Sequence, residues 1–254
     1  MLSDQYRLRA EFWDCFFGDR DAEIKFWADW AARYGQRVLA PMCATGEVAA
    51  GLRERGLRVL GVDIVAAMVR LGRSRVGDDR EIFFLQGDVS ALPLRTGAFD
   101  FAFLGTGDFH HFLTEDEQLR VLQSIWRILR PGGGLGLALY PPPRGKKGKT
   151  SGKKRFPPLR PPADAQVQVW KESETQYHPH NRRLTISQTI FVIDNHQQNK
   201  FSYVLNLQLF QQKEMQSLLK SAGFEMVAEL GSYQGEPYVT GAADWIVIVE
   251  KPAL

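Results

Sequence analysis

Hydrophobic and polar positions follow two different patterns along this chain. Through the first 140 residues, apolar runs of strand length alternate with longer segments whose apolar residues recur every three or four positions. That alternation is typical of consecutive strand–helix–strand units, which build a parallel sheet. The predicted strands are Arg37 to Pro41, Leu57 to Asp63, Glu81 to Gln86, Phe99 to Leu104 and Leu135 to Tyr140, and the predicted helices are Val48 to Arg55, Ala66 to Arg75 and Glu115 to Leu129.

The third helix has clear start and stop signals. Thr114 is placed as its N-cap, and Glu117, three residues later, is the expected capping-box partner. The run Pro131-Gly132-Gly133-Gly134 follows the helix and is expected to stop it before the fifth strand.

Beyond the fifth strand the period changes to two. Segments 166–177, 184–194 and 201–209 alternate polar with apolar residues and are separated by turn-forming residues, which predicts an antiparallel meander. A helix near 212–222 and strands near 224–230 and 245–249 then return to the first pattern. The meander, residues 164–210, is therefore predicted to be an insertion within a single domain spanning 1–254. The expected fold is a doubly wound, mostly parallel seven-stranded α/β sheet with this antiparallel insertion after the fifth strand.

Two flanking segments have unusual compositions. Residues 1–35 are rich in aromatic side chains and predict an N-terminal helical cap, with Phe26 and Trp30 on one helical face. Residues 144–160 hold eight basic residues in seventeen and no acidic one, among glycines and prolines. They predict a basic lid loop over 141–163.

Composition and charge exclude several classes of protein. The chain of 254 residues has a net charge of +3 and ordinary globular proportions of apolar and charged residues. Cys15 and Cys43 are too few for a disulfide framework and lack the spacing of a zinc site, so a reducing cytoplasmic setting and no metal are expected. Neither a signal peptide nor a membrane span is predicted.

The ends of the predicted strands contain the candidate binding residues, because ligands of doubly wound sheets lie beyond the carboxyl ends of the strands. The turn from Pro41 to Gly46 consists of small residues before a helix, which suits backbone contact with a ligand. Asp63 closes the second strand and can accept hydrogen bonds from both hydroxyls of a ribose. Asp88 follows the third strand and can accept from an adenine amine, and Leu104 and Gly105 would line the far wall.

Four of these segments together resemble class I methyltransferases that use S-adenosylmethionine (SAM), in the branch that acts on N or O of small molecules. The segments are Val38 to Glu47, Gly61 to Met68, Gly87-Asp88-Val89 and Leu129-Arg130-Pro131-Gly132-Gly133, and residues 218–224 and 247–252 fit the same family. The resemblance implies that the turn holds the methionine part of SAM, Asp63 the ribose and Gly87-Asp88-Val89 the adenine. The residues expected to contact SAM are Pro41, Met42, Cys43, Ala44, Thr45, Gly46, Asp63, Ile64, Met68, Gly87, Asp88, Val89, Leu104 and Gly105.

Two positions depart from the family's pattern. Ala40 stands where the family has an acidic residue, which removes an anchor near the methionine end of SAM. Ala44 stands where a glycine is common, so the turn must avoid positive φ at Ala44 or accept strain there.

The candidate catalytic residues are Asp108, His111, His110 and Tyr140, near the ends of the fourth and fifth strands. Either histidine could serve as a general base, and Asp108 could bind an acceptor amine. We expect transfer to N or O of a small-molecule acceptor by a monomer or homodimer. The alternatives are an RNA methyltransferase that uses the basic residues 144–160 and a SAM-binding protein without turnover. A nucleic-acid substrate is disfavoured because Leu104 to Asp108 lacks the Asn/Asp-Pro-Pro-Tyr signature of base-amine methylation.

Overall fold

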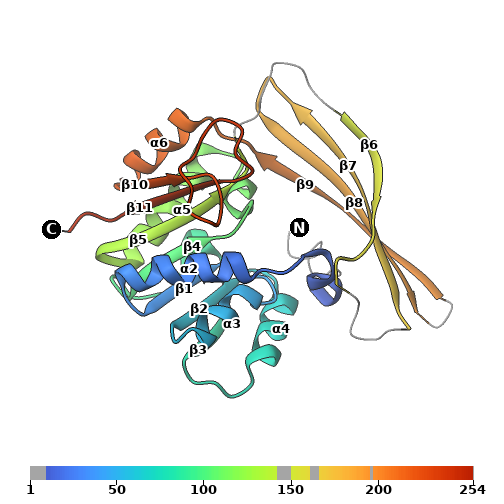
Figure 1. The fold of residues 1–254 in the computed structure, drawn as a ribbon, viewed down its shortest axis with the longest axis horizontal. Coiled ribbons are helices and arrows are strands. Elements are labelled where there is room, and N and C mark those ends of the chain that lie inside the picture. Colours follow the sequence, from blue (N-terminus) through green and yellow to red (C-terminus); the bar gives the residue numbers. More distant parts are fainter. Residues whose placement is uncertain (1–9, 142–149, 161–165, 195–196, 254) are drawn as a thin grey trace.

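A computed structural model of the chain, shown in Figure 1, describes residues 10–141, 150–160, 166–194 and 197–253. Its main body is a seven-stranded sheet of order β10-β11-β5-β4-β1-β2-β3. The strands are β1 (Arg37–Pro41), β2 (Arg58–Asp63), β3 (Ile82–Gln86), β4 (Phe99–Leu104), β5 (Leu129–Leu139), β10 (Glu225–Leu230) and β11 (Trp245–Glu250). β11 pairs antiparallel with both β5 and β10, and the other pairings are parallel. The predicted doubly wound sheet is confirmed.

Helices cover both faces of this sheet, because each contributes an apolar stripe to one of two hydrophobic clusters. α2 (Asp21–Tyr34), α3 (Glu47–Glu54) and α4 (Ala66–Val76) contribute buried residues to one cluster. α5 (Glu115–Ile128) and α6 (Gln212–Ser221) contribute to the other. In the described parts of the chain, no helix is both long and apolar enough to cross a membrane.

The start of α5 is as predicted, but its end is not. Thr114 and Glu117 form the expected capping box. The helix ends at Ile128, and β5 begins at once with Leu129, which is already extended at φ −73° and ψ 139°. The predicted Pro-Gly stop followed by a strand at 135 was therefore wrong. Arg130 precedes a proline, which disfavours helical backbone, and its guanidinium donates to Asp100 Oδ1 at 3.0 Å.

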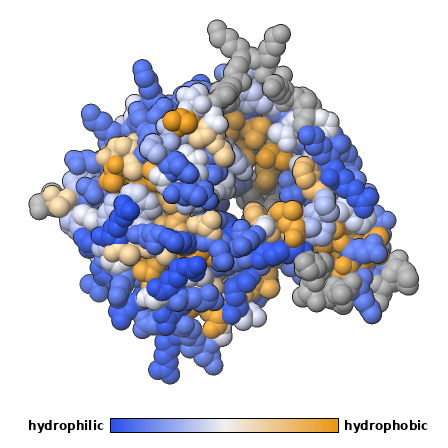
Figure 2. Space-filling view, viewed as in Figure 1, coloured by the Kyte–Doolittle hydropathy of each residue, from blue (hydrophilic) through white to orange (hydrophobic). Residues whose placement is uncertain are grey.

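The insertion forms a second, four-stranded antiparallel sheet that extends away from the main body in Figure 1. Its strands are β6 (Thr150–Phe156), β7 (Gln168–His178), β8 (Arg183–Asp194) and β9 (Gln197–Gln208). The predicted meander corresponds to β7, β8 and β9. Figure 2 shows apolar surface where this sheet faces the main body.

β6 lies within the segment predicted as a basic lid loop, so that prediction was wrong for residues 150–156. Two of its three basic residues have cross-strand partners on β7: Lys153 pairs with Glu172 at 2.6 Å, and the Arg155 guanidinium lies 4.3 Å from the Trp170 ring centroid. Charged side chains are common on an edge strand, where they discourage pairing with another chain. Residues 157–160 of the predicted lid form neither helix nor strand, and its residues 142–149 and 161–163 lie outside the described residues.

The N-terminal cap predicted over residues 1–35 is helical from Asp21 to Tyr34, where α2 buries Phe26 and Trp30, but the described residues before it form only short 3₁₀ turns. Turns η1 (Ala10–Phe12) and η2 (Asp14–Phe16) precede α2. Cys15 of η2 packs with residues of the second sheet, including Val169 and Ile190. The N-terminal segment therefore joins the second sheet to the main body next to the carboxyl ends of the strands.

Candidate functional site

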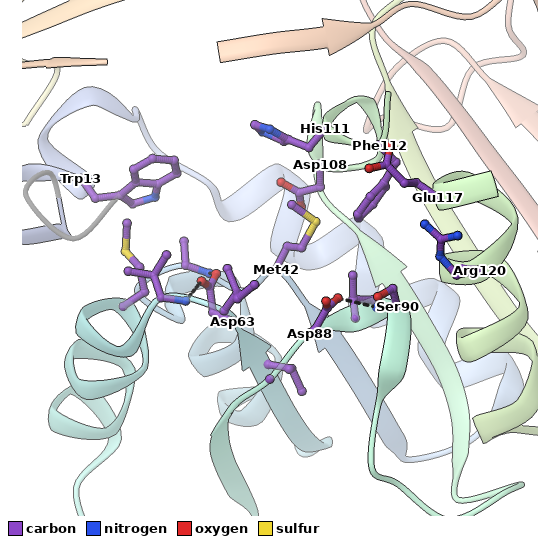
Figure 3. A pocket seen from close by; sticks show the side chains of 17 residues that line it. Trp13, Met42, Asp63, Asp88, Ser90, Asp108, His111, Phe112, Glu117 and Arg120 are labelled. Atoms are coloured by element: carbon purple, nitrogen blue, oxygen red, sulfur yellow. Dashed lines mark hydrogen bonds between the residues drawn. The ribbon is translucent and has the colours of Figure 1, made fainter. Parts of the chain in front are cut away.

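A pocket of about 340 Å³ lies at the carboxyl ends of β1, β2 and β3 (Figure 3). This size is within the usual range for small-molecule sites. We call it the first pocket. The residues that line it are Trp13, Met42, Ala44, Val62, Asp63, Ile64, Val65, Met68, Gly87, Asp88, Val89, Ser90, Asp108, His111, Phe112, Glu117 and Arg120.

Asp63 lies on the floor of the first pocket, between Trp13 and Asp88 in Figure 3. The backbone N–H of Ala44 donates to its Oδ2, and that of Val65 to its Oδ1, each at 2.9 Å. A carboxylate oxygen has two lone pairs, so both oxygens can still accept from a ligand. Burial raises the pKa of Asp63, against the opposing effect of these backbone bonds.

Asp88 begins the short turn η3 (Val89–Ala91) beside Asp63. Its Oδ1 accepts the backbone N–H of Ser90 at 2.8 Å, which fixes the carboxylate at the pocket wall. Val89 is buried in the core beneath it. Arg120 and Glu117 close the other end, and Glu117 also caps α5, as its Oε2 accepts the N–H groups of Leu113 and Thr114.

The turn between β1 and α3 adopts left-handed backbone at three residues. Met42 has φ 55°, Ala44 φ 48° and Gly46 φ 75°. Of the two alternatives predicted for Ala44, the turn accepts positive φ. Hydrogen bonds hold it in place: the Cys43 N–H donates to Val62 O at 3.0 Å, and the Ala44 N–H donates to Asp63.

Gly46 lies against an aromatic ring. A Cβ at this position would lie 2.4 Å from two ring carbons of Phe84, and Gly61 and Gly72 contact the same ring. Among the described residues that line the pockets, neither Gly46 nor Leu104 appears; Leu104 is buried in the core. The predicted SAM contacts of these two residues therefore stay predictions.

A second pocket, of about 260 Å³, adjoins the first and shares Trp13, Met42, Ala44, Asp108 and His111 with it. We call it the second pocket. Its other lining residues come from the η2–α2 region, the β1 turn, the start of α3, the ends of β4 and β5, and the second sheet. They are Phe17, Arg20, Glu23, Ala40, Pro41, Cys43, Thr45, Glu47, Val48, Ala49, Phe103, Gly105, Thr106, Gly107, Tyr140, Lys171, Ile186, Gln188, Leu205 and Leu207.

Three of the four predicted catalytic residues, Asp108, His111 and Tyr140, line the second pocket. Burial raises the pKa of Asp108 to about 8, with a further contribution from Glu23 and an opposing one from Arg20. A carboxyl group with this pKa is mostly protonated at pH 7. Burial and Asp108 also raise the pKa of the Tyr140 hydroxyl.

His110, the fourth candidate, is fully buried, and both of its ring nitrogens are engaged. Its Nε2 accepts the backbone N–H of Tyr140 at 2.8 Å, so Nδ1 carries the proton and donates to Gln208 O at 2.5 Å. Burial lowers its pKa to about 4. The predicted role of general base was therefore wrong for His110, which instead fixes the end of β9 to the end of β5.

Other lining residues were not predicted. Arg20 and Glu23 come from the N-terminal cap and Lys171, Ile186 and Leu205 from the second sheet. Their positions in the sequence give no signal, since only the folded chain brings them to the ends of the central strands.

Comparisons with known proteins agree with this geometry. Residues 38–133 match the family described as "Methyltransferase domain". Demethylmenaquinone methyltransferase of Thermus thermophilus is 34% identical over 111 residues, which are 42% of this chain and 49% of that protein. The chain thus spans about half the length of that relative. Cypemycin N-terminal methyltransferase of a Streptomyces species is 24% identical over 218 residues, or 85% of this chain and 84% of that protein.

The fold agrees as well. The structure of SAM-bound CalS10, an amino pentose methyltransferase from Micromonospora echinaspora, superposes with a TM-score of 0.69 and 21% identity, covering 92% of each chain. Residues 38–133 thus match a methyltransferase domain, and the sheet order and overall fold agree with the class I, SAM-dependent methyltransferases that the sequence resembles.

Proposed function

We propose that this protein transfers a methyl group from SAM to a nitrogen or oxygen atom of a small-molecule acceptor. The observation that carries the proposal is that the two pockets adjoin and share five lining residues, among them Asp108 and His111. A donor in the first pocket and an acceptor in the second would meet at these residues. In-line displacement from a sulfonium depends mainly on such alignment and on exclusion of water.

The first pocket has the groups needed for an adenosyl ligand. Asp63 keeps acceptor capacity on both oxygens for ribose hydroxyls, and Asp88 offers a fixed carboxylate for an adenine amine. Trp13 and Met68 supply apolar surface on the remaining side. SAM bound there would supply an activated methyl group, and the residues of the chain would orient it.

The second pocket suits an acceptor with apolar and polar parts. Ile186, Leu205 and Leu207 present aliphatic side chains from the second sheet, and Gln188 adds a polar group. An amine must lose its proton before methylation, and His111 at the junction, or Asp108 once it has lost its own proton, could accept it. The names of two similar proteins, an amino pentose methyltransferase and an N-terminal methyltransferase, support nitrogen ahead of oxygen. A cytoplasmic monomer or homodimer remains the prediction for the whole protein.

Calorimetric titration with S-adenosylhomocysteine tests the donor site. We expect one site per chain, and Asp63→Asn should weaken binding by about 10- to 100-fold. The control is Asp79→Asn, because Asp79 is a surface carboxylate that pairs with Arg53 outside both pockets. Absence of binding to the unmodified protein would refute the proposal.

Incubation with methyl-labelled SAM and separate panels of amines and alcohols tests the acceptor. Label should enter an amine more readily than its hydroxyl counterpart. Transfer confined to hydroxyl compounds would contradict the preference for nitrogen, and no transfer to any acceptor would favour a binding protein without turnover.

A further inference from the structure

The second pocket contains charges that the proposed methyl transfer leaves unexplained. Arg20 and Glu23, one turn apart on or beside α2, reach the ends of β1 and β4. Glu23 is only 8% exposed. Burying a carboxylate is costly unless it has partners, so its surroundings indicate what it can bind.

The two oxygens of Glu23 differ in how they are engaged. Oε2 accepts from Arg20 Nε at 2.8 Å and lies 2.6 Å from Arg20 Nη2. Oε1 accepts only a long bond of 3.4 Å from Trp27 Nε1 among the hydrogen bonds given by the described residues. Oε1 therefore keeps capacity for a stronger donor.

Glu23 Oε1 faces the end of β4. A Cβ built on Gly105 would lie 3.6 Å from Glu23 Oε1 and 3.1 Å from Asp108 Oδ2. The two carboxyl groups thus converge beside a glycine, and any side chain at residue 105 would occupy the space they share. Gly105 and Ala40 both line this part of the second pocket.

Ala40 lies at the position where the resemblance to class I methyltransferases implies an acidic residue. Its methyl group cannot bind a cation, yet the methionyl end of SAM bears an α-ammonium and an α-carboxylate. The Arg20–Glu23 ion pair presents one charge of each sign, which is complementary to such a zwitterion. Of the two carboxyl groups near Gly105, Glu23 is the one salt-bridged to a guanidinium.

We propose that Glu23 anchors the α-ammonium of the methionyl group, supplying from helix α2 the carboxylate that β1 lacks at Ala40. The inference rests on the proposed function, since it requires SAM in the first pocket, with its amino-acid end reaching past the shared β1 turn into the adjoining part of the second pocket. It assigns Glu23 a binding role, with Gly105 leaving the space for the ammonium and Arg20 holding the carboxylate in place.

Two ligands that differ only in the amino-acid part provide the test. S-Adenosylhomocysteine has the ammonium, and 5′-methylthioadenosine lacks the whole amino-acid group. Glu23→Gln should lower the affinity for S-adenosylhomocysteine by about 10- to 100-fold and change the affinity for 5′-methylthioadenosine by less than about twofold. The comparison variant Asp63→Asn should lower the affinity for both ligands, because both contain the ribose. Equal effects of Glu23→Gln on the two ligands, or none, would overturn the inference.

A second arm needs no substitution and so does not depend on folding of a variant. The unmodified protein should bind the deaminated analogue of S-adenosylhomocysteine about 10- to 100-fold more weakly than the parent compound, and Glu23→Gln should add little to that loss. An analogue that binds as tightly as its parent would overturn the role of Glu23 while leaving the proposed function intact. Failure of the unmodified protein to bind any of the three ligands would instead refute the proposed function.

Discussion

Gly46 provides a sharp test of how the ligand-binding turn is built, because two costs of adding one methyl group can be separated there. Its φ of 75° lies in the left-handed region, where an L-residue costs about 1–2 kcal/mol. Its Cβ would also lie 2.4 Å from the Phe84 ring, and overpacking of this kind costs about 1–3 kcal/mol. Gly46→Ala should therefore lower the free energy of unfolding by about 2–5 kcal/mol.

Gly56→Ala isolates the backbone cost. Gly56 has φ 87°, and nothing lies within 4 Å of its Cβ position. This variant should lose only about 1–2 kcal/mol. Urea unfolding followed by tryptophan fluorescence measures both variants, and the difference between them is the contribution of Phe84.

A double-mutant cycle completes the experiment. In a Phe84→Leu background the aromatic ring is gone, so Gly46→Ala should cost about as much as Gly56→Ala, about 1–2 kcal/mol. The reasoning is refuted if Gly46→Ala in the unmodified background costs no more than Gly56→Ala.

Three further predictions concern charge and capping. The unfolded chain binds a proton at His110 below about pH 6.5, but the folded chain does so only near pH 4, so this residue removes about 3 kcal/mol of stability as pH falls through that range. His110→Gln should reduce the pH dependence of the urea midpoint between pH 6.5 and 4, and an unchanged slope would contradict the burial of a neutral imidazole. Asp108 holds its proton below about pH 8, and a sulfonium cation beside it favours the carboxylate. The affinity for SAM, measured by calorimetry, should therefore rise between pH 6.5 and 8.5. It should rise more than the affinity for S-adenosylhomocysteine, whose sulfur is neutral. Equal rises for the two ligands would contradict the placement of Asp108 beside the sulfonium. Thr114→Ala removes the α5 cap and should cost about 1 kcal/mol in thermal unfolding, whereas Thr114→Ser should stay close to the unmodified protein; equal losses would show that the hydroxyl contributes little.

The sequence by itself determined the elements that depend on local chemistry. β1 was predicted with its exact bounds, and the Thr114–Glu117 capping box was predicted residue by residue, because strand periodicity and caps involve neighbours in the chain. The ends of β1, β2 and β3 were located for the same reason. Asp63 and Asp88 follow from the rule that the carboxyl ends of parallel strands meet at one edge.

Tertiary structure decided what depends on partners distant in sequence. The basic composition of residues 150–156 indicated a loop, but Glu172 and Trp170 on β7 supply the contacts that make it a strand. As a histidine near a strand end, His110 was a candidate general base, yet both of its ring nitrogens are hydrogen-bonded, one to Gln208 O and the other to the Tyr140 N–H. Glu23 could not be predicted as a site residue, because nothing near it in the sequence indicates that α2 reaches the end of β4. Local patterns specify which elements form, whereas the environment of a buried side chain, and thus its chemistry, is set by residues that only the fold brings near.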